Sequence, residues 1–233
     1  VVTAIQDRTG LIEFPDVIQG SDEWHDQRRG IVTASVVGQL VTPKTFKIAA
    51  NDKSRSIVTQ LVAERITGYT DPTYVGDDML SGIEDELRAS ELYAEVYQRP
   101  VREVGFLLRK ESTWQLGYSP DGLVGDDGLI EVKSRRSKLQ LSTILADEVP
   151  AEYVAQCQAG LLVSGREWLD FISFSGGMPM WHKRVYPDPA WHEAIIAAAE
   201  GFETTAAEMT ADYLAKTEGL PATERTTFME LTI

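Results

Sequence analysis

The chain has 233 residues, of which 43% are hydrophobic and 25% charged, and its formal net charge is −14. These values are typical of a globular protein with one large or two small domains. No apolar run reaches the ~20 residues that cross a bilayer, and no basic start followed by an apolar stretch marks a secretory signal. The single cysteine excludes an internal disulfide and a multi-cysteine zinc site. We therefore expect a cytoplasmic protein without a membrane segment.

Two short helices are predicted near the N-terminus. Ser21 is a candidate N-cap for the first helix, which Gly30 ends. Thr33 or Ser35 is a candidate N-cap for the second, which extends to about Val41.

Two longer helices follow in the sequence. Apolar side chains at helical spacing predict a helix over 54–67, which Gly68 ends. A second predicted helix covers 77–98, and Pro100 prevents its continuation. Its candidate core positions are Leu80, Ile83, Leu87, Leu92 and Val96.

After Pro100 the apolar residues alternate with other residues, which predicts strands. The expected elements are strands over 104–109, 114–119 and 129–133, a helix over 151–163, strands over 168–174 and 181–186, and a final helix over 190–215. The first three strands predict a meander, and the crossover helix allows the fourth strand to run parallel to a neighbour. We therefore predict an α/β fold, an α+β mixed sheet flanked by helices.

We predict one domain over 1–233, because no linker or repeat divides the chain. Its parts would be N-terminal helices over 20–68, a core over 77–186, and a C-terminal helix and tail over 187–233.

The most informative residues lie on and before the third predicted strand. Ser119-Pro120-Asp121-Gly122 precedes the strand, which carries Glu131-Val132-Lys133. Side chains at i and i+2 of a strand share a face, so Glu131 and Lys133 project together. Two carboxylates suit a hard divalent cation, and an adjacent ammonium can polarise a phosphate. The pattern is typical of metal-dependent phosphodiester cleavage. The alternative is a hairpin with a solvent-facing Glu–Lys pair, since Asp-Gly is also a common turn dipeptide.

The charge is unevenly distributed along the chain. Residues 187–233 contain nine acidic and two basic residues, which is half of the net negative charge. Two basic stretches comprise Lys133, Arg135, Arg136 and Lys138, and Lys44, Lys47, Lys53 and Arg55. A basic stripe beside an acidic body would steer DNA to one face. The alternative is two solvated loops.

Helix, three strands, helix and strand, with an Asp followed by Glu-x-Lys, is also the core of the restriction-endonuclease-like, PD-(D/E)xK nuclease superfamily. Within it the chain resembles lambda exonuclease and the YqaJ-type viral recombinases over most of its length. The matching blocks are Gln19-Gly20 with Asp22, Trp24-His25, Arg28 and Gly30; Thr33-Ala34-Ser35; Ser119-Pro120-Asp121-Gly122; Gly128-Leu129 with Glu131-x-Lys133; and Ala155-Gln156-x-Gln158.

The resemblance implies a Mg²⁺-dependent 5′-to-3′ exonuclease that digests one strand of linear double-stranded DNA, with Mn²⁺ substituting for Mg²⁺. The 3′ single-stranded overhangs would serve phage-type recombination by single-strand annealing. Asp121, Glu131 and the backbone carbonyl of Val132 are the implied metal ligands, and Lys133 is the implied catalytic lysine. Glu86 matches an assisting glutamate of the preceding helix, and its neighbour Asp85 is the alternative.

The resemblance also implies a pocket for the 5′-phosphate, formed by Arg28, Ser35, Ser119 and Gln158. An Arg side chain offers a planar fork of donors that suits phosphate, and a helix N-terminus attracts anions. The alternatives are a surface salt bridge for Arg28 and a plain N-cap for Ser35.

The implied partners are double-stranded DNA with a free 5′ end, a single-strand annealing protein and further copies of the chain in a ring-shaped homotrimer. Enclosure of DNA in such a ring would substitute for net attraction by an acidic subunit. Two alternatives stay open. One is a superfamily nuclease with another polarity or endonucleolytic action, and the other is a non-catalytic DNA-end-binding subunit.

Overall fold

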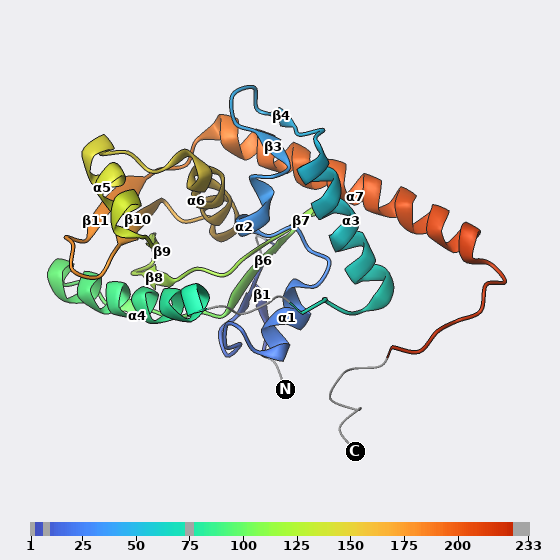
Figure 1. The fold of residues 1–233 in the computed structure, drawn as a ribbon, viewed down its shortest axis with the longest axis horizontal. Coiled ribbons are helices and arrows are strands. Elements are labelled where there is room, and N and C mark those ends of the chain that lie inside the picture. Colours follow the sequence, from blue (N-terminus) through green and yellow to red (C-terminus); the bar gives the residue numbers. More distant parts are fainter. Residues whose placement is uncertain (1–2, 7–9, 73–76, 226–233) are drawn as a thin grey trace, which may run out of the picture.

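The computed structural model describes residues 3–6, 10–72 and 77–225, and it describes side chains of the last range from residue 82 (Figure 1). The helices are α1 (Asp22–Arg28), α2 (Ala34–Val37), α3 (Asp52–Thr67), α4 (Asp77–Tyr97), α5 (Ser137–Ala146), α6 (Ala151–Ser164) and α7 (Pro189–Thr217). The strands are β1 (Ile5–Gln6), β2 (Leu11–Phe14), β3 (Val41–Thr42), β4 (Lys47–Ile48), β5 (Val101–Arg102), β6 (Phe106–Lys110), β7 (Gln115–Tyr118), β8 (Gly122–Val124), β9 (Gly128–Ser134), β10 (Trp168–Phe174) and β11 (Trp181–Val185).

The strands form two main sheets, and a β3–β4 hairpin lies apart from both. The order β11-β10-β9-β8-β5 makes a five-stranded mixed sheet in which only β9 and β10 are parallel. The order β1-β2-β6-β7 makes a four-stranded antiparallel sheet. The predicted mixed α/β architecture and the parallel pairing of the fourth predicted strand are therefore confirmed.

The predicted meander is wrong in one respect, because β7 and β9 lie in different sheets. The chain leaves β7 through Ser119-Pro120-Asp121 and then forms the short strand β8, which the alternation did not reveal. Pro120 has no N–H to donate, and it interrupts the ladder between the two sheets. Asp121 thus lies at the junction of the sheets.

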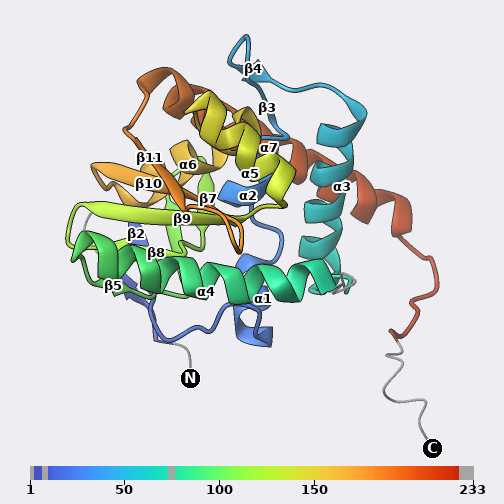
Figure 2. The same ribbon diagram turned by 60° about the vertical axis from the view of Figure 1, so that its left-hand side comes forward.

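Helices cover both faces of the five-stranded sheet (Figures 1 and 2). On one face, α4 packs Ala89 and Tyr93 in a cluster with Ile130. On the other face, Leu129 and Phe171 belong to a larger core that α6 and α7 help to form. None of the helices in the described part of the chain is long and apolar enough to span a bilayer.

The predicted core positions of α4 are wrong. Ile83 and Val96 are 58% and 56% exposed, and Leu87 and Leu92 are also exposed. The side chain of Leu80 lies outside the described residues. The helix instead buries small Ala89 and amphipathic Tyr93 against the sheet. The apolar spacing therefore predicted as core a face of α4 that is exposed to solvent.

The predicted positions of α3, α6 and α7 are confirmed to within a few residues at each end. Asn51 and Ser54 form a capping box that starts α3 slightly earlier than expected, and Gly68 ends it at a φ of +62°. Ser21 accepts a hydrogen bond from the Trp24 N–H at 3.2 Å, as predicted for the N-cap of α1. The helix α2 is shorter than predicted, because it ends at Val37.

The helix α5 was not predicted. Its Leu139, Leu141 and Leu145 are exposed, whereas Gln140 and Thr143 are buried. The amide of Gln140 donates to the backbone carbonyl of Ser173 at 3.0 Å, which ties α5 to β10. The helix α5 is therefore held against β10 by a buried polar side chain and not by its leucines, which is why apolar spacing did not predict it.

Gly128, at the start of β9, allows a test of how closely β9 packs against the Trp168 ring of β10. A Cβ at Gly128 would lie 2.1 Å from the Trp168 ring, and the Arg184 guanidinium lies over that ring at 3.7 Å. Gly128→Ala should therefore lower the free energy of unfolding by about 1–3 kcal/mol, measured by chemical denaturation. In the matched control Gly176→Ala, the added Cβ meets no described atom within 4 Å, so stability should change little. Equal stability of the two variants would contradict this packing.

Candidate active site

Asp121 and β9 are held together by the backbone. Gly122 pairs with Ile130, so Asp121 lies opposite Glu131, and its Oδ2 accepts the N–H of the next residue, Val132, at 2.5 Å. The N–H and C=O of one strand residue point to the same side of the strand. The carbonyl of Val132 therefore points toward Asp121, as its predicted role as a ligand requires.

Glu131 and Lys133 share a face of β9, as predicted, and Lys133 Nζ lies 2.6 Å from Glu131 Oε1. The Glu131 side chain is 1% exposed and that of Lys133 is 21% exposed, so the solvent-facing pair considered above is wrong. Ile130 and Val132 point to the opposite face, into the cluster beneath α4.

Two further side chains bind Glu131. The Tyr118 hydroxyl donates to Glu131 Oε2 at 2.9 Å, and the Gln156 amide donates to Oε1. Sequence reasoning assigned no role to either residue. Gln156 lies within a recognised block, which was a usable signal, whereas Tyr118 was simply one residue of a strand pattern.

The structure distinguishes Glu86 from Asp85. Glu86 and Asp121 line the same cleft of about 310 Å³, together with Asp16 and Glu103. Asp85 instead accepts a hydrogen bond from the Ser134 hydroxyl at 2.7 Å. Glu86 is thus the acidic residue of this pair that shares a cleft rich in carboxylates with Asp121.

The carboxyl groups of the site oppose one another's ionisation. Burial raises the pKa of Asp121 well above its usual range, and the charge of Glu131 raises it further, while Lys133 lowers it. Burial also raises the pKa of Glu86, with Lys133 lowering it and Glu131 raising it. For Lys133, burial acts to lower the pKa, but Glu131 and Asp121 together raise it above its usual value. The lysine stays charged, and the negative charge around it is only partly balanced.

The available donors suit a hard cation. Within the described ranges, no three side chains of His, Cys, Asp or Glu converge as a ready-made metal cluster. The local donors are the carboxylates of Asp121 and Glu131 and the carbonyl of Val132, with Glu86 on the cleft wall. Oxygen donors in small number fit Mg²⁺, which keeps several waters, better than zinc.

Arg28 and Ser119 are brought together as the predicted pocket requires. Arg28 Nη1 and Trp24 Nε1 donate to Ser119 Oγ at 3.0 and 2.8 Å, and the guanidinium lies 3.9 Å from the Trp24 ring centroid. Burial lowers the pKa of Arg28 to about 10, although Glu64 acts to raise it. Arg28 therefore contacts a hydroxyl and a ring at the site rather than forming an exposed surface pair.

The other two predicted pocket residues differ. Ser35 is exposed in the first turn of α2, where its hydroxyl lies 3.1 Å from that of Thr33. Thr33 occupies the N-cap, so the plain N-cap reading of Ser35 is wrong. Gln158 is buried, donates to the Tyr186 carbonyl at 2.9 Å and accepts the Asp188 N–H at 2.9 Å. These bonds tie α6 to the connection before α7 and give no support to phosphate binding by Gln158.

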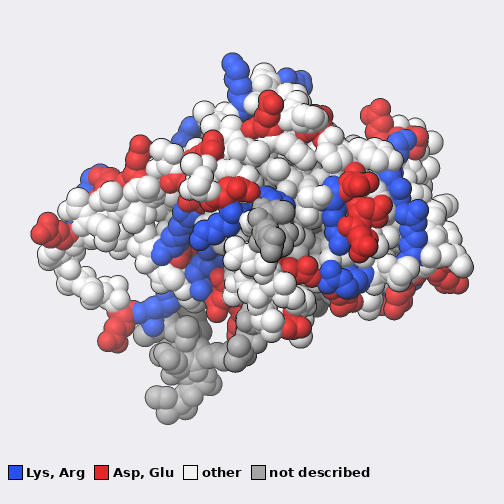
Figure 3. Space-filling view, turned by 180° about the vertical axis from the view of Figure 1, so that it is seen from behind, with Lys and Arg blue, Asp and Glu red and all other residues white. Residues whose placement is uncertain are grey.

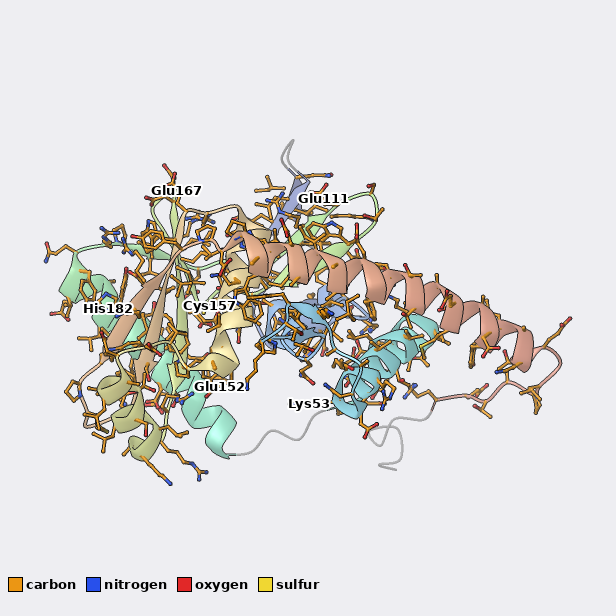
Figure 4. All side chains as sticks on the ribbon, turned by 90° about the horizontal axis from the view of Figure 1, so that it is seen from above. Lys53, Glu111, Glu152, Cys157, Glu167 and His182 are labelled. Atoms are coloured by element: carbon orange, nitrogen blue, oxygen red, sulfur yellow. The ribbon has the colours of Figure 1, made fainter. Side chains whose placement is uncertain are left out.

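The two basic stretches are not equally available to DNA. Arg135 is buried and pairs with Glu152 at 3.2 Å, at the start of α6 (Figure 4). The other stretch, by contrast, is exposed at Lys44, Lys47, Lys53 and Arg55, with Lys53 in the first turn of α3 (Figure 4). On the face shown in Figure 3, acidic and basic side chains lie side by side.

Cys157 is buried within α6, and burial raises the pKa of its thiol. It is therefore a packing residue of the core.

Solved structures provide close matches to the fold. An alkaline exonuclease from Laribacter hongkongensis matches with a TM-score of 0.74 and 29% identity, covering 85% of this chain and 98% of that one. Its complex with dAMP matches at 0.73 and 30%, with the same coverage. A phage-related exonuclease from Haemophilus somnus, at 13% identity and a TM-score of 0.51, covers 77% of this chain and 96% of its own and shows the fold alone.

The sequence comparisons agree with the fold. No curated protein matches the chain. The model of the YqaJ-like viral recombinase domain matches residues 23–167, a range that includes Arg28, Asp121, Glu131 and Lys133. This range is more than half of the chain, and the chain therefore belongs to the YqaJ-like viral recombinase domain family, whose structural relatives include alkaline exonucleases.

Proposed function

We propose that the protein is a Mg²⁺-dependent 5′-to-3′ exonuclease that degrades one strand of linear double-stranded DNA and leaves 3′ single-stranded overhangs. The observation that carries the proposal is the placement of Glu131, Lys133 and Asp121 on and beside the C-terminal half of β9, next to an acidic cleft. The alkaline exonuclease relatives support the reaction class, and the dAMP complex of one relative supports a site for a nucleotide.

Each residue has a separate role in the proposed hydrolysis. Asp121, Glu131 and the carbonyl of Val132 would hold Mg²⁺, and Mn²⁺ would substitute. When bound, the cation supplies charge neutralisation of the scissile phosphate and a lower pKa for its bound water. Lys133, which its acidic neighbours keep protonated, stabilises charge on the phosphate oxygens. Glu86 would assist from the wall of the same cleft.

The polarity of the proposed reaction rests on Arg28 and Ser119. Ser119 lies two residues before Asp121, so their Cα atoms are at most about 7 Å apart. A terminal 5′-phosphate bound by Arg28 and Ser119 would leave a neighbouring phosphodiester near Asp121. This spacing favours release of nucleotides from a 5′ end over cleavage within a continuous strand.

We further propose that the protein acts as a ring-shaped homotrimer with a single-strand annealing protein as partner. The net charge of −14 and the mixed charges of the face in Figure 3 offer little general attraction for DNA. Enclosure would retain the substrate instead. A monomer in analytical ultracentrifugation would contradict the ring.

The catalytic residues are tested with linear duplex DNA labelled at the 5′ or the 3′ terminus. Asp121→Asn should reduce Mg²⁺-dependent hydrolysis to background, and Lys133→Ala should reduce it about 100- to 1,000-fold because charge stabilisation is lost. Asp126→Asn is the control, since Asp126 is exposed in the β8–β9 turn. Retained activity in Asp121→Asn would refute the site. Cleavage of closed circular DNA would indicate an endonuclease, and binding of ends without hydrolysis in the unchanged protein would indicate a binding subunit.

The phosphate pocket is tested by comparing 5′-phosphorylated with 5′-hydroxyl ends. Arg28→Ala should slow digestion of phosphorylated ends roughly 10- to 100-fold, because a hydrogen bond between charged groups is lost. Hydroxyl ends should be affected much less. Arg102→Ala, which removes an exposed arginine from β5, should change neither rate. An equal loss on both ends in Arg28→Ala would remove Arg28 from phosphate recognition.

The raised pKa of Asp121 predicts a pH dependence of stability. The pKa of Asp121 is raised in the folded protein, so folding is favoured while Asp121 is protonated and opposed once it ionises. Without a divalent cation, stability should therefore fall as the pH rises from about 4 through the raised pKa. Asp121→Asn should melt at a higher temperature than the unchanged protein at alkaline pH, and the difference should vanish toward about pH 4.

Mg²⁺ adds a second arm to this melting experiment. The cation should raise the melting temperature of the unchanged protein at alkaline pH and leave that of Asp121→Asn almost unaltered. Asp126→Asn should behave like the unchanged protein in both conditions. Identical melting curves for the Asp121→Asn and unchanged proteins at every pH would contradict the electrostatic account.

A further inference from the structure

Tyr118 is the last residue of β7, and its side chain is fully enclosed. The residue is 1% exposed, and its hydroxyl donates to Glu131 Oε2 at 2.9 Å. A buried hydroxyl without a partner would be unfavourable, so this bond fixes the phenol and the carboxylate relative to each other. Tyr118 and Glu131 belong to different sheets, and the bond therefore crosses the junction at which Asp121 lies.

Gly160 provides the space for the tyrosine ring. A Cβ at position 160 would lie 2.8 Å from Tyr118 Cζ and 2.9 Å from Cε1. Glycine is unfavourable within a helix, and Gly160 lies in the interior of α6. The close approach of the Tyr118 ring explains why this position is a glycine, since any larger side chain would collide with the ring.

The three donors to Glu131 are divided unequally between its oxygens. Lys133 and Gln156 both contact Oε1, whereas Tyr118 contacts Oε2. The terminal torsion of a glutamate is broad, so its carboxylate plane depends on external hydrogen bonds. Lys133 is the donor that the proposed hydrolysis directs to the phosphate. Tyr118 is therefore the donor that keeps Oε2 in place while Lys133 acts elsewhere.

We propose that Tyr118 is a positioning residue that acts through Glu131, orienting its carboxylate toward Asp121 for a divalent cation. The inference rests on the proposed function, since it assigns Glu131 to the cation. Groups that hydrogen-bond a ligating carboxylate are known to govern metal affinity in proteins generally. Gly160 supports this role by admitting the ring.

The direct test is Mg²⁺ and Mn²⁺ binding to the whole protein, measured by isothermal titration calorimetry without DNA. Tyr118→Phe keeps the ring and removes the hydroxyl, and it should raise both dissociation constants about tenfold. Hydrolysis should fall at limiting Mg²⁺ and recover at saturating Mg²⁺, because Glu131 and Lys133 are unchanged.

Tyr93→Phe is the matched control. Tyr93 is also 1% exposed, and its hydroxyl donates to the carboxylate of Asp170 at 2.7 Å, on the α4 face of the sheet. Loss of this hydroxyl should lower stability in a similar way but leave cation binding unaltered. An equal loss of cation affinity in both variants would reduce Tyr118 to a merely structural residue and overturn the inference.

Gly160→Ala is the second variant, for the case that Tyr118→Phe does not fold. It should displace the ring and weaken Mg²⁺ binding in the same direction. Asp121→Asn separates the two proposals. If Asp121→Asn abolishes binding while Tyr118→Phe binds like the unchanged protein, the positioning role fails and the proposed function stands. If the unchanged protein binds neither cation, the proposed function fails as well.

Discussion

The hydrogen bond between Asp121 Oδ2 and the N–H of Val132 is the interaction on which the site depends. It joins the linker between the two sheets to the strand that carries Glu131 and Lys133. The bond places two carboxyl groups near each other in a buried region, where burial and Glu131 raise the pKa of Asp121. Such an arrangement opposes folding at alkaline pH unless a positive charge compensates it. Lys133 supplies part of that charge, and the proposed cation would supply the rest.

The fold maintains this arrangement from several sides. The pairing of Gly122 with Ile130 sets the register that places Asp121 opposite Glu131, and its side chain then reaches the N–H of Val132. Apolar packing beneath α4 holds the opposite face of β9, and α6 supplies the amide of Gln156 to Glu131. A strand held on both faces cannot easily slip, because a shift by one residue would move Glu131 to the α4 face. The geometry of the charged residues is therefore a consequence of sheet register and helix packing together.

Much of the site could be predicted because it follows a short-range rule. Glu131 and Lys133 share a face because strand side chains alternate, and Ser119 and Asp121 are close because they are close in sequence. The relation between Glu131 and Tyr118 could not be predicted, since it depends on how two sheets meet across a proline. For Gln158, the matching sequence block predicted a role in phosphate binding. In the structure its side-chain amide instead forms hydrogen bonds with the backbone of Tyr186 and Asp188, just before α7. In α4, apolar spacing indicated Ile83 and Val96 as core, but the sheet contacts Ala89 and Tyr93.

We propose above all that a divalent cation binds between Asp121 and Glu131, beside the C-terminal half of β9. Anomalous diffraction from crystals of the protein grown with Mn²⁺ tests it most directly, since Mn²⁺ takes the same oxygen ligands as Mg²⁺. We predict an anomalous peak within coordination distance of both carboxylates and of the Val132 carbonyl. A peak elsewhere, or none at these oxygens with Mn²⁺ in excess, would contradict it.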